Sequence, residues 1–222
     1  LAKGPCELVN VAREPEIIDL ANCLNAMGAK ISGHGTGTIL VEGVDELHGA
    51  THAVISDRIE AGTFAIAAAM TGCALTLRRT KARTLDALLM VLRETGSTVT
   101  ETDDTIRVVA NNRPVAADIT TDPFPGFPTD LQAQFMAMMC IADGSSRISE
   151  TIFENRFMHV PELLRMGADI QVDGGIAMVR GREFLTPAPV MATDLRASVS
   201  LVLAALTMRG KSHISRIYHL DR

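Results

Sequence analysis

The chain has 222 residues, of which 47% are hydrophobic and 21% charged. This composition provides ample material for a packed core and excludes an intrinsically disordered chain. The 21 basic and 26 acidic residues leave a net charge of −5. Proteins that bind nucleic acid or membrane surfaces are normally basic, so neither partner is expected. The longest apolar run, Phe64–Leu77, is interrupted by Thr71 and Gly72, so no membrane-spanning helix is expected either.

One pattern occurs three times along the chain: an amphipathic helix, a glycine that ends it, and a strand. The three copies are Glu16–Ile31, Thr84–Val99 and His159–Ile170. Their glycines repeat at a spacing of about 70 residues, which suggests lobes of one domain rather than a solenoid. Each copy continues into a predicted hairpin. The hairpin strands are Lys30–Ser32 with Thr38–Val41, Thr98–Thr100 with Thr105–Val109, and Ile170–Val172 with Ala177–Val179.

A second kind of helix follows each hairpin and is apolar almost all round, which predicts burial on every side. The three are Asp57–Met70, Asp130–Ala142 and Asp194–Met208, and a short β-like run follows each one. The sequence therefore predicts an α/β (α+β) inside-out barrel of three pseudo-symmetric units, with buried helices inside and sheets outside. No linker is evident, so residues 1–222 are expected to form one domain.

The four cysteines are far apart and form no CxxC pair: Cys6, Cys23, Cys73 and Cys140. A zinc site or a thioredoxin-like motif is therefore not expected. A disulfide framework is not expected in a long acidic chain of this kind, so we expect free thiols in a reducing compartment. The GxGxG segment Gly33–Gly37 lies between two predicted strands, which favours a hairpin turn over a dinucleotide motif.

Each buried helix opens with an acid, namely Asp57, Asp130 and Asp194. One interpretation is that these residues only cap helices, and Asp57–Glu60 and Thr129–Gln132 have capping-box form. If the helices run parallel, however, their N-termini converge into a positive field that suits phosphate or carboxylate ligands. Three arginines lie at or near these helix openings, and a fourth, Arg222, directly follows another acid. Such a cluster favours a small polyanionic substrate, and surface ion pairing is the alternative interpretation. The four arginines are Arg58, Arg156, Arg196 and Arg222.

The proline-rich loop Pro123–Pro128 leads straight into Asp130. Pro128 disfavours a helical conformation at the residue before it and delivers Thr129 and Asp130 in a fixed orientation. This is more scaffolding than an ordinary cap requires, which points to a functional role for Asp130. His159 is open to either an acid–base or a structural role.

Six strings of the chain resemble the UDP-N-acetylglucosamine 1-carboxyvinyltransferase family of bacterial enolpyruvyl transferases. They are Ala12–Ile17, Asp57–Thr63, Phe127–Phe135, Glu150–Leu163, Met191–Ser198 and Arg216–Arg222. The resemblance implies two inside-out domains, each of three βαβαββ units, with the active site between them. It also implies transfer of enolpyruvyl from phosphoenolpyruvate to the 3′-hydroxyl of UDP-N-acetylglucosamine, the first committed step of peptidoglycan synthesis, in the cytoplasm and without a cofactor or metal.

Site residues follow from the same resemblance. Asp130 matches the group that binds and deprotonates the sugar hydroxyl, Ile152 a position whose backbone contacts the sugar nucleotide, and Phe153 its packing neighbour. Arg196 and Arg222 match arginines that hold phosphoenolpyruvate. Arg156 and Asp194 match residues that line the cleft and assist domain closure.

The chain departs from the family in length, because family chains are about twice as long and carry further phosphoenolpyruvate ligands and an acidic cysteine in an N-terminal half. Nothing in this sequence matches that half, so we expect a C-terminal domain that is inactive alone. Two alternatives stay open at this point: the shikimate-pathway enolpyruvyl transferase, and a non-catalytic half-domain that binds a sugar nucleotide.

Overall fold

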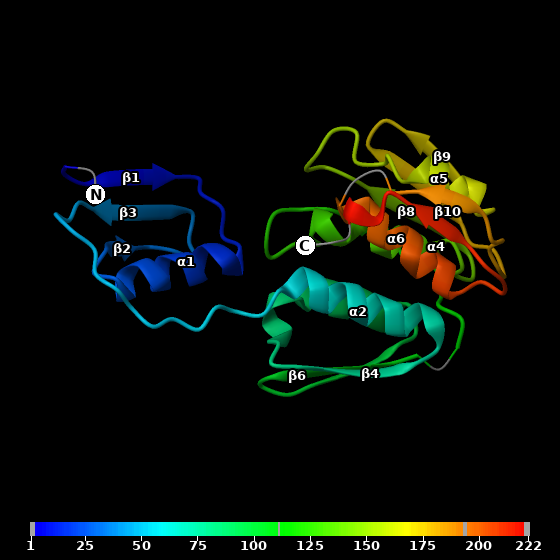
Figure 1. Cartoon of the computed structure of the whole chain (residues 1–222), viewed down its shortest axis with the longest axis horizontal. Helices are drawn as coiled ribbons and strands as arrows, with labels where there is room; N and C mark the ends of the chain where they lie inside the picture. Colours follow the sequence, from blue (N-terminus) through cyan, green and yellow to red (C-terminus); the bar gives the residue numbers. More distant parts are fainter. Residues whose placement is uncertain (1–2, 111, 193–194, 220–222) are drawn as a thin grey trace. The chain divides into compact units, whose positions relative to one another are not determined.

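A computed structural model describes residues 3–110, 112–192 and 195–219 of the chain, without the side chains of residues 195–197 and 219. Its contacts group into two compact units (Figure 1). Unit 1 comprises Leu1–Ser56 and Pro123–Pro125, and unit 2 comprises Asp57–Asp122 and Gly126–Arg222. Each unit is described by itself, and the expectation of one domain stays a prediction.

Unit 1 holds the first copy of the repeat. Its elements are β1 (Cys6–Val9), α1 (Pro15–Ala26), β2 (Lys30–Ser32) and β3 (Thr38–Glu42). The helix begins at Pro15, where a missing N–H leaves no hydrogen bond unmade. The strands form an antiparallel sheet in the order β1-β3-β2. The segment Gly33–Gly37 is the turn between β2 and β3, so the hairpin interpretation of this glycine-rich motif is confirmed.

Unit 2 opens with α2 (Arg58–Thr71) and the second copy of the repeat. This copy contains β4 (Ala74–Arg78), the 3₁₀ turn η1 (Ala82–Thr84), α3 (Asp86–Glu94), β5 (Thr98–Glu101) and β6 (Thr105–Val109). The sheet order is β4-β6-β5. Figure 1 shows α2 lying along β4 and β6. The apolar stripe of α3, made by Leu88, Leu89 and Leu92, is completely buried, as an amphipathic helix on a sheet requires.

The third copy follows in the same unit. It is preceded by β7 (Ile119–Thr120), the 3₁₀ turn η2 (Thr129–Leu131) and α4 (Gln132–Met139), and it contains β8 (Ser145–Ser149), α5 (Val160–Arg165), β9 (Asp169–Asp173) and β10 (Ile176–Arg180). The sheet order is β7-β8-β10-β9, with β7 parallel to β8. The described chain ends with β11 (Pro189–Met191), α6 (Leu195–Leu206), β12 (His213–Ser215) and the 3₁₀ turn η3 (Ile217–His219).

The predicted repeat is confirmed in the connectivity of the sheets. In each copy the third strand lies between the first and the second, and all these pairings are antiparallel. A residue with positive φ also follows the first strand of the first two copies, Asn10 after β1 and Arg79 after β4. Arg216 takes the same conformation after β12, as the opening of a further unit would.

The core of unit 2 is built around the apolar helices. Every residue of α4 is buried, and α4 lies beside α6, in which Leu201 and Ala204 are fully buried (Figure 1). Small and unbranched side chains allow such close packing of helices. The prediction of burial on every side holds for α4 but not fully for α2, because Phe64 is 51% exposed.

The four cysteines are free thiols, as the sequence predicts. Burial of Cys140, the residue directly after α4, raises the pKa of its thiol from 9.0 to about 12. Since deprotonation then occurs far more readily in the unfolded chain, Cys140 contributes stability below about pH 9 that is lost as the pH rises toward 12.

At pH 8, a thiol reagent should label exposed Cys6 and Cys73 in the native protein and Cys140 only after denaturation. Native labelling of Cys140 at the rate of Cys73 would contradict its burial.

Gly181 is a close-approach position after β10. Its N–H donates to the Gly144 carbonyl (3.0 Å), and a Cβ added there would overlap the Ala142 carbonyl oxygen. Gly181→Ala should therefore lower the free energy of unfolding by about 2 kcal/mol, measured by urea denaturation. The matched control is Gly37→Ala, where an added Cβ meets nothing within 4 Å. Equal unfolding midpoints for the two variants would refute the close approach.

Candidate functional site

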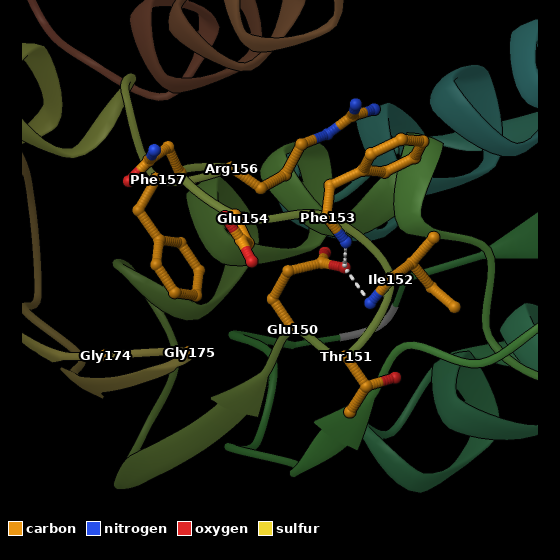
Figure 2. Close-up of a pocket in the computed structure, with 10 residues that line it drawn as sticks. Glu150, Thr151, Ile152, Phe153, Glu154, Arg156, Phe157, Gly174 and Gly175 are labelled. Carbon is orange, nitrogen blue, oxygen red and sulfur yellow. Dashed lines mark hydrogen bonds between the residues drawn. The ribbon is translucent and has the colours of Figure 1, made fainter.

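A pocket of about 530 Å³ lies in unit 2 at the end of β8 (Figure 2). It is lined by the connection between β8 and α5 and by the turn between β9 and β10. The lining residues are Glu150–Phe157 and Gly174–Gly175. Eight consecutive residues on one loop therefore shape a single hollow. This is a common arrangement for binding sites because loops vary while the scaffold stays rigid.

The loop is attached to the β9–β10 turn by its backbone. The Glu150 N–H donates to the Gly175 carbonyl oxygen at 2.7 Å. A Cβ on Gly175 would lie 2.8 Å from the Glu150 carbonyl oxygen, so glycine is needed for this close contact. Farther along, Asn155 adopts a left-handed conformation with φ of 56°, which turns the chain back toward α5.

The side chain of Glu150 is buried at the base of the loop and accepts four hydrogen bonds. Its Oε1 accepts from the N–H groups of Ile152 (2.8 Å) and Phe153 (3.1 Å), as Figure 2 shows. The same oxygen accepts from the Thr121 hydroxyl (2.9 Å), and Oε2 accepts from the Thr129 hydroxyl (2.9 Å). A buried carboxylate is stable only with such compensation.

Asp130 lies in η2, between the extended Pro128 (φ −71°, ψ 129°) and the buried helix α4. Its backbone carbonyl accepts from the Gln134 side chain (3.0 Å). That side chain also donates to the Thr63 hydroxyl of α2 (3.1 Å). Asp130 is thus placed by the packed core, as the proline-based argument from the sequence anticipates.

The expected capping box at Thr129–Gln132 is wrong. Neither η2 nor α4 has a side-chain cap, and the Thr129 hydroxyl donates to Glu150 instead. The carboxylate outcompetes the helix end because a charged acceptor makes the stronger hydrogen bond. At Asp57, by contrast, Oδ1 accepts from the N–H groups of Ile59 (2.8 Å) and Glu60 (3.0 Å), so that cap is confirmed.

Arg156 connects the pocket to Asp130. Its Nη2 donates to Asp130 Oδ1 at 2.6 Å, and its guanidinium lies 5.1 Å from the centre of the Phe153 ring. Figure 2 shows Arg156 and Phe153 on the same side of the loop, whereas Phe157 turns away. Phe153 is 54% exposed, so one aromatic face stays available to a ligand. The arrangement combines a carboxylate, a cation and an aromatic surface at the edge of one pocket.

Four of the residues implied by the resemblance lie together here: Asp130, Ile152, Phe153 and Arg156. Asp194 and Arg222 lie outside the described residues, and for Arg196 only its backbone place in α6 is described. Glu150 is the residue that sequence reasoning missed. The signal that could have found it is an acid at a strand end, directly before a threonine and a predicted binding loop.

Other sequence candidates have structural places. His159 is fully buried directly before α5, and Arg58 is 8% exposed at the start of α2. In the ranges that the structure describes, no three His, Cys, Asp or Glu side chains gather as a metal site would require. Over the same part of the chain, no helix is both long and apolar enough to span a bilayer.

Comparison with known proteins assigns the chain to a family. All of it, residues 1–222, matches the EPSP synthase (3-phosphoshikimate 1-carboxyvinyltransferase) family. The chain belongs to the EPSP synthase family. Among curated members of this kind, a UDP-N-acetylglucosamine 1-carboxyvinyltransferase from Afipia carboxidovorans is 60% identical over 225 residues. The match covers 100% of this chain and 52% of that protein, so the chain spans about half the length of the relative.

Solved structures agree with membership of the EPSP synthase family and with a mixed α/β fold. The enolpyruvyl transferase NikO from Streptomyces tendae has a TM-score of 0.87 at 26% identity, over 99% of this chain and 53% of its own. The EPSP synthase from Acinetobacter baumannii has a TM-score of 0.71 at 19% identity, over 96% of this chain and 52% of its own. The second likeness speaks only for the fold.

The Arg156–Asp130 pair can be tested by a double-mutant cycle on stability. Its side chains are 24% and 34% exposed, whereas the Arg182–Asp169 pair (3.0 Å) has 55% and 27%. We expect a coupling energy of about 1 kcal/mol for the first pair, and below about 0.5 kcal/mol for the second, because water screens exposed charges. Equal coupling energies from urea denaturation would mean that Arg156 does not hold Asp130 in place.

Proposed function

We propose that this chain supplies the C-terminal half of an enzyme that transfers enolpyruvyl from phosphoenolpyruvate to the 3′-hydroxyl of UDP-N-acetylglucosamine and releases phosphate. The observation that carries the proposal is the 60% identity, along the whole chain, to a protein named for this reaction. The other half of the site would come from an N-terminal domain of the same enzyme. An assembly of this kind serves peptidoglycan synthesis in the cytoplasm, where the free cysteines stay reduced.

Asp130 is the proposed base. In the addition step the sugar oxygen bonds to C2 of phosphoenolpyruvate, a base takes the hydroxyl proton, and an acid from the other half of the site gives a proton to C3, so that a tetrahedral ketal forms. In the elimination step a proton is removed from C3 and phosphate leaves, which gives the enolpyruvyl product. The hydrogen bond from Arg156 (2.6 Å) holds the Asp130 carboxylate at the pocket edge, ready to receive the hydroxyl.

The loop between β8 and α5 is the proposed seat of the sugar nucleotide. Ile152 would contact it through its backbone, and Phe153 would pack against it with its exposed ring. Arg156, already placed between Asp130 and Phe153, would line the cleft and respond to closure of the two domains. Closure expels water, which strengthens every charge interaction in the site.

Phosphoenolpyruvate is the proposed ligand of Arg196 and Arg222, with Asp194 assisting closure. Guanidinium groups match phosphate and carboxylate because their paired N–H donors are planar and always charged. The N-terminus of α6, in which Arg196 lies, would add a favourable dipole for an anion. The net charge of −5 does not oppose this assignment, since a few local cations suffice for a small anion.

The finer architecture belongs to the same proposal. We infer an inside-out barrel of three βαβαββ units, supported by the identical strand order in the three sheets and by the burial of α4.

Asp130→Asn should leave the fold intact and lower kcat by about 10²- to 10⁴-fold, because an amide cannot take the hydroxyl proton. The assay is phosphate release from phosphoenolpyruvate and UDP-N-acetylglucosamine by the complete enzyme that carries this chain. Asp169→Asn, on β9 and outside the pocket, is the matched control and should retain normal turnover.

Two outcomes would overturn the proposal. Turnover of shikimate 3-phosphate in place of the sugar nucleotide would favour the shikimate-pathway reaction. Normal turnover by the isolated 222-residue chain would refute the assignment of half a site, since the chain alone is expected to be inactive.

A further inference from the structure

We propose that Glu150 is the positioning residue of the sugar-nucleotide site, acting through the backbone of Ile152 and the placement of Asp130. The inference rests on the proposed function and goes beyond it, because Glu150 belongs to neither the base nor the ligand contacts assigned above. Glu150 is 8% exposed, and its carboxylate joins three separate segments of unit 2.

The first consequence of this carboxylate is the direction of two peptide groups. The N–H groups of Ile152 and Phe153 both point at Glu150 Oε1. In a planar trans peptide the carbonyl points opposite to the N–H of the following residue. The carbonyl oxygens of Thr151 and Ile152 therefore point away from Glu150, and the loop presents two hydrogen-bond acceptors on its other side.

These acceptors define what kind of ligand atom fits there. The N–H groups of both residues are already engaged, so the backbone at Ile152 can offer a ligand only an accepting oxygen. A sugar hydroxyl, an acetamido N–H or a base N–H is a suitable partner, whereas a phosphate or carboxylate oxygen is repelled. Glu150 thus makes this loop a site for the sugar nucleotide rather than for phosphoenolpyruvate.

The second consequence is the spacing between the base and the loop. Oε2 accepts from the hydroxyl of Thr129, the residue directly before Asp130. Oε1 accepts from the N–H groups of Ile152 and Phe153. Because the two oxygens belong to one rigid carboxylate, they determine the distance between η2 and the loop. Thr121, at the end of β7, ties this frame to the sheet through its hydroxyl and accepts the Thr151 N–H (2.9 Å).

A carboxylate suits this place because all four partners donate to it. An alanine would leave two backbone N–H groups and two hydroxyls without their acceptor. Glutamine can restore most of the set: its carbonyl oxygen replaces Oε1, and its NH₂ can donate to the Thr129 hydroxyl, which is able to accept. Glu150→Gln is therefore a conservative variant, and Glu150→Ala is the disruptive one.

The test measures steady-state kinetics of the complete enzyme with both substrates varied. Glu150→Ala should raise KM for UDP-N-acetylglucosamine by about 10- to 100-fold, as expected for loss of one or two oriented hydrogen bonds. The KM for phosphoenolpyruvate should change by less than about threefold, since its proposed ligands, Arg196 and Arg222, are not among the groups that Glu150 holds. Glu150→Gln should recover most of the loss.

Two further variants separate positioning from stability. Thr129→Val removes only the Oε2 bond and should lower kcat more than it raises KM, because it releases the segment that bears Asp130. Glu162→Ala is the matched control: Glu162 also accepts a backbone N–H, that of Met191 (2.9 Å), but lies outside the pocket and should leave the KM for UDP-N-acetylglucosamine unchanged.

Amide hydrogen exchange supplies a readout that does not depend on turnover. In Glu150→Ala the Ile152 and Phe153 amides should exchange at least about tenfold faster than in the unsubstituted protein, and in Glu150→Gln they should stay protected. Three results would overturn the inference: an unchanged KM for UDP-N-acetylglucosamine in Glu150→Ala, an equal rise in the KM of both substrates in that variant, or an equal rise in the KM for UDP-N-acetylglucosamine in Glu162→Ala. If the unsubstituted enzyme does not turn over phosphoenolpyruvate and UDP-N-acetylglucosamine, the proposed function itself is refuted. The inference about substrate placement then fails with it, whatever the exchange rates are.

Discussion

Burial of the Glu150 carboxylate imposes a strict local requirement on this protein. Glu150 lies at the end of a sheet strand, and its charge is compensated by donors that reach it from several segments. Two of these donors are backbone N–H groups, so meeting the electrostatic requirement also determines the path of the chain. The loop after β8, the 3₁₀ turn before α4 and the edge of the third sheet are consequently ordered by one interaction. Remote packing supports it, since Gln134 anchors Asp130 to α2.

Much of the fold could be predicted from the sequence because the repeat gives the same signals three times. Hairpins at Lys30–Glu42, Thr98–Val109 and Asp169–Arg180 follow from turn residues between alternating strands, and each lies where expected. The burial of α4 follows from a helix with no polar face. These features depend on neighbouring residues, and local patterns in a sequence record such features directly.

Of the candidate site, Asp130 and Arg156 could be singled out from the sequence itself, Ile152 and Phe153 only through resemblance, and the contacts among them not at all. Arg156 and Asp130 are 26 residues apart, and nothing in their spacing indicates that they meet. Thr129 has the sequence of a helix cap, yet its hydroxyl goes to a carboxylate that follows a distant strand. Phe64 is another case, because an apolar helix does not reveal which of its sides lacks a neighbour. Long-range competition for hydrogen bonds and packing decides each of these outcomes.

The connection from the first strand to the amphipathic helix differs between the copies. It runs over residues 10–14 in the first copy, 79–85 in the second and 150–159 in the third. The third and longest connection forms the pocket around Ile152 and Arg156, and the second lines a smaller pocket of about 370 Å³ at Lys81–Arg83, while the sheets keep one topology. Internal duplication followed by unequal lengthening of these connections would produce such a molecule: the redundant scaffold preserves stability, and the connections are free to diverge. Under the proposed function, exchange of the third connection would change substrate preference without redesign of the fold.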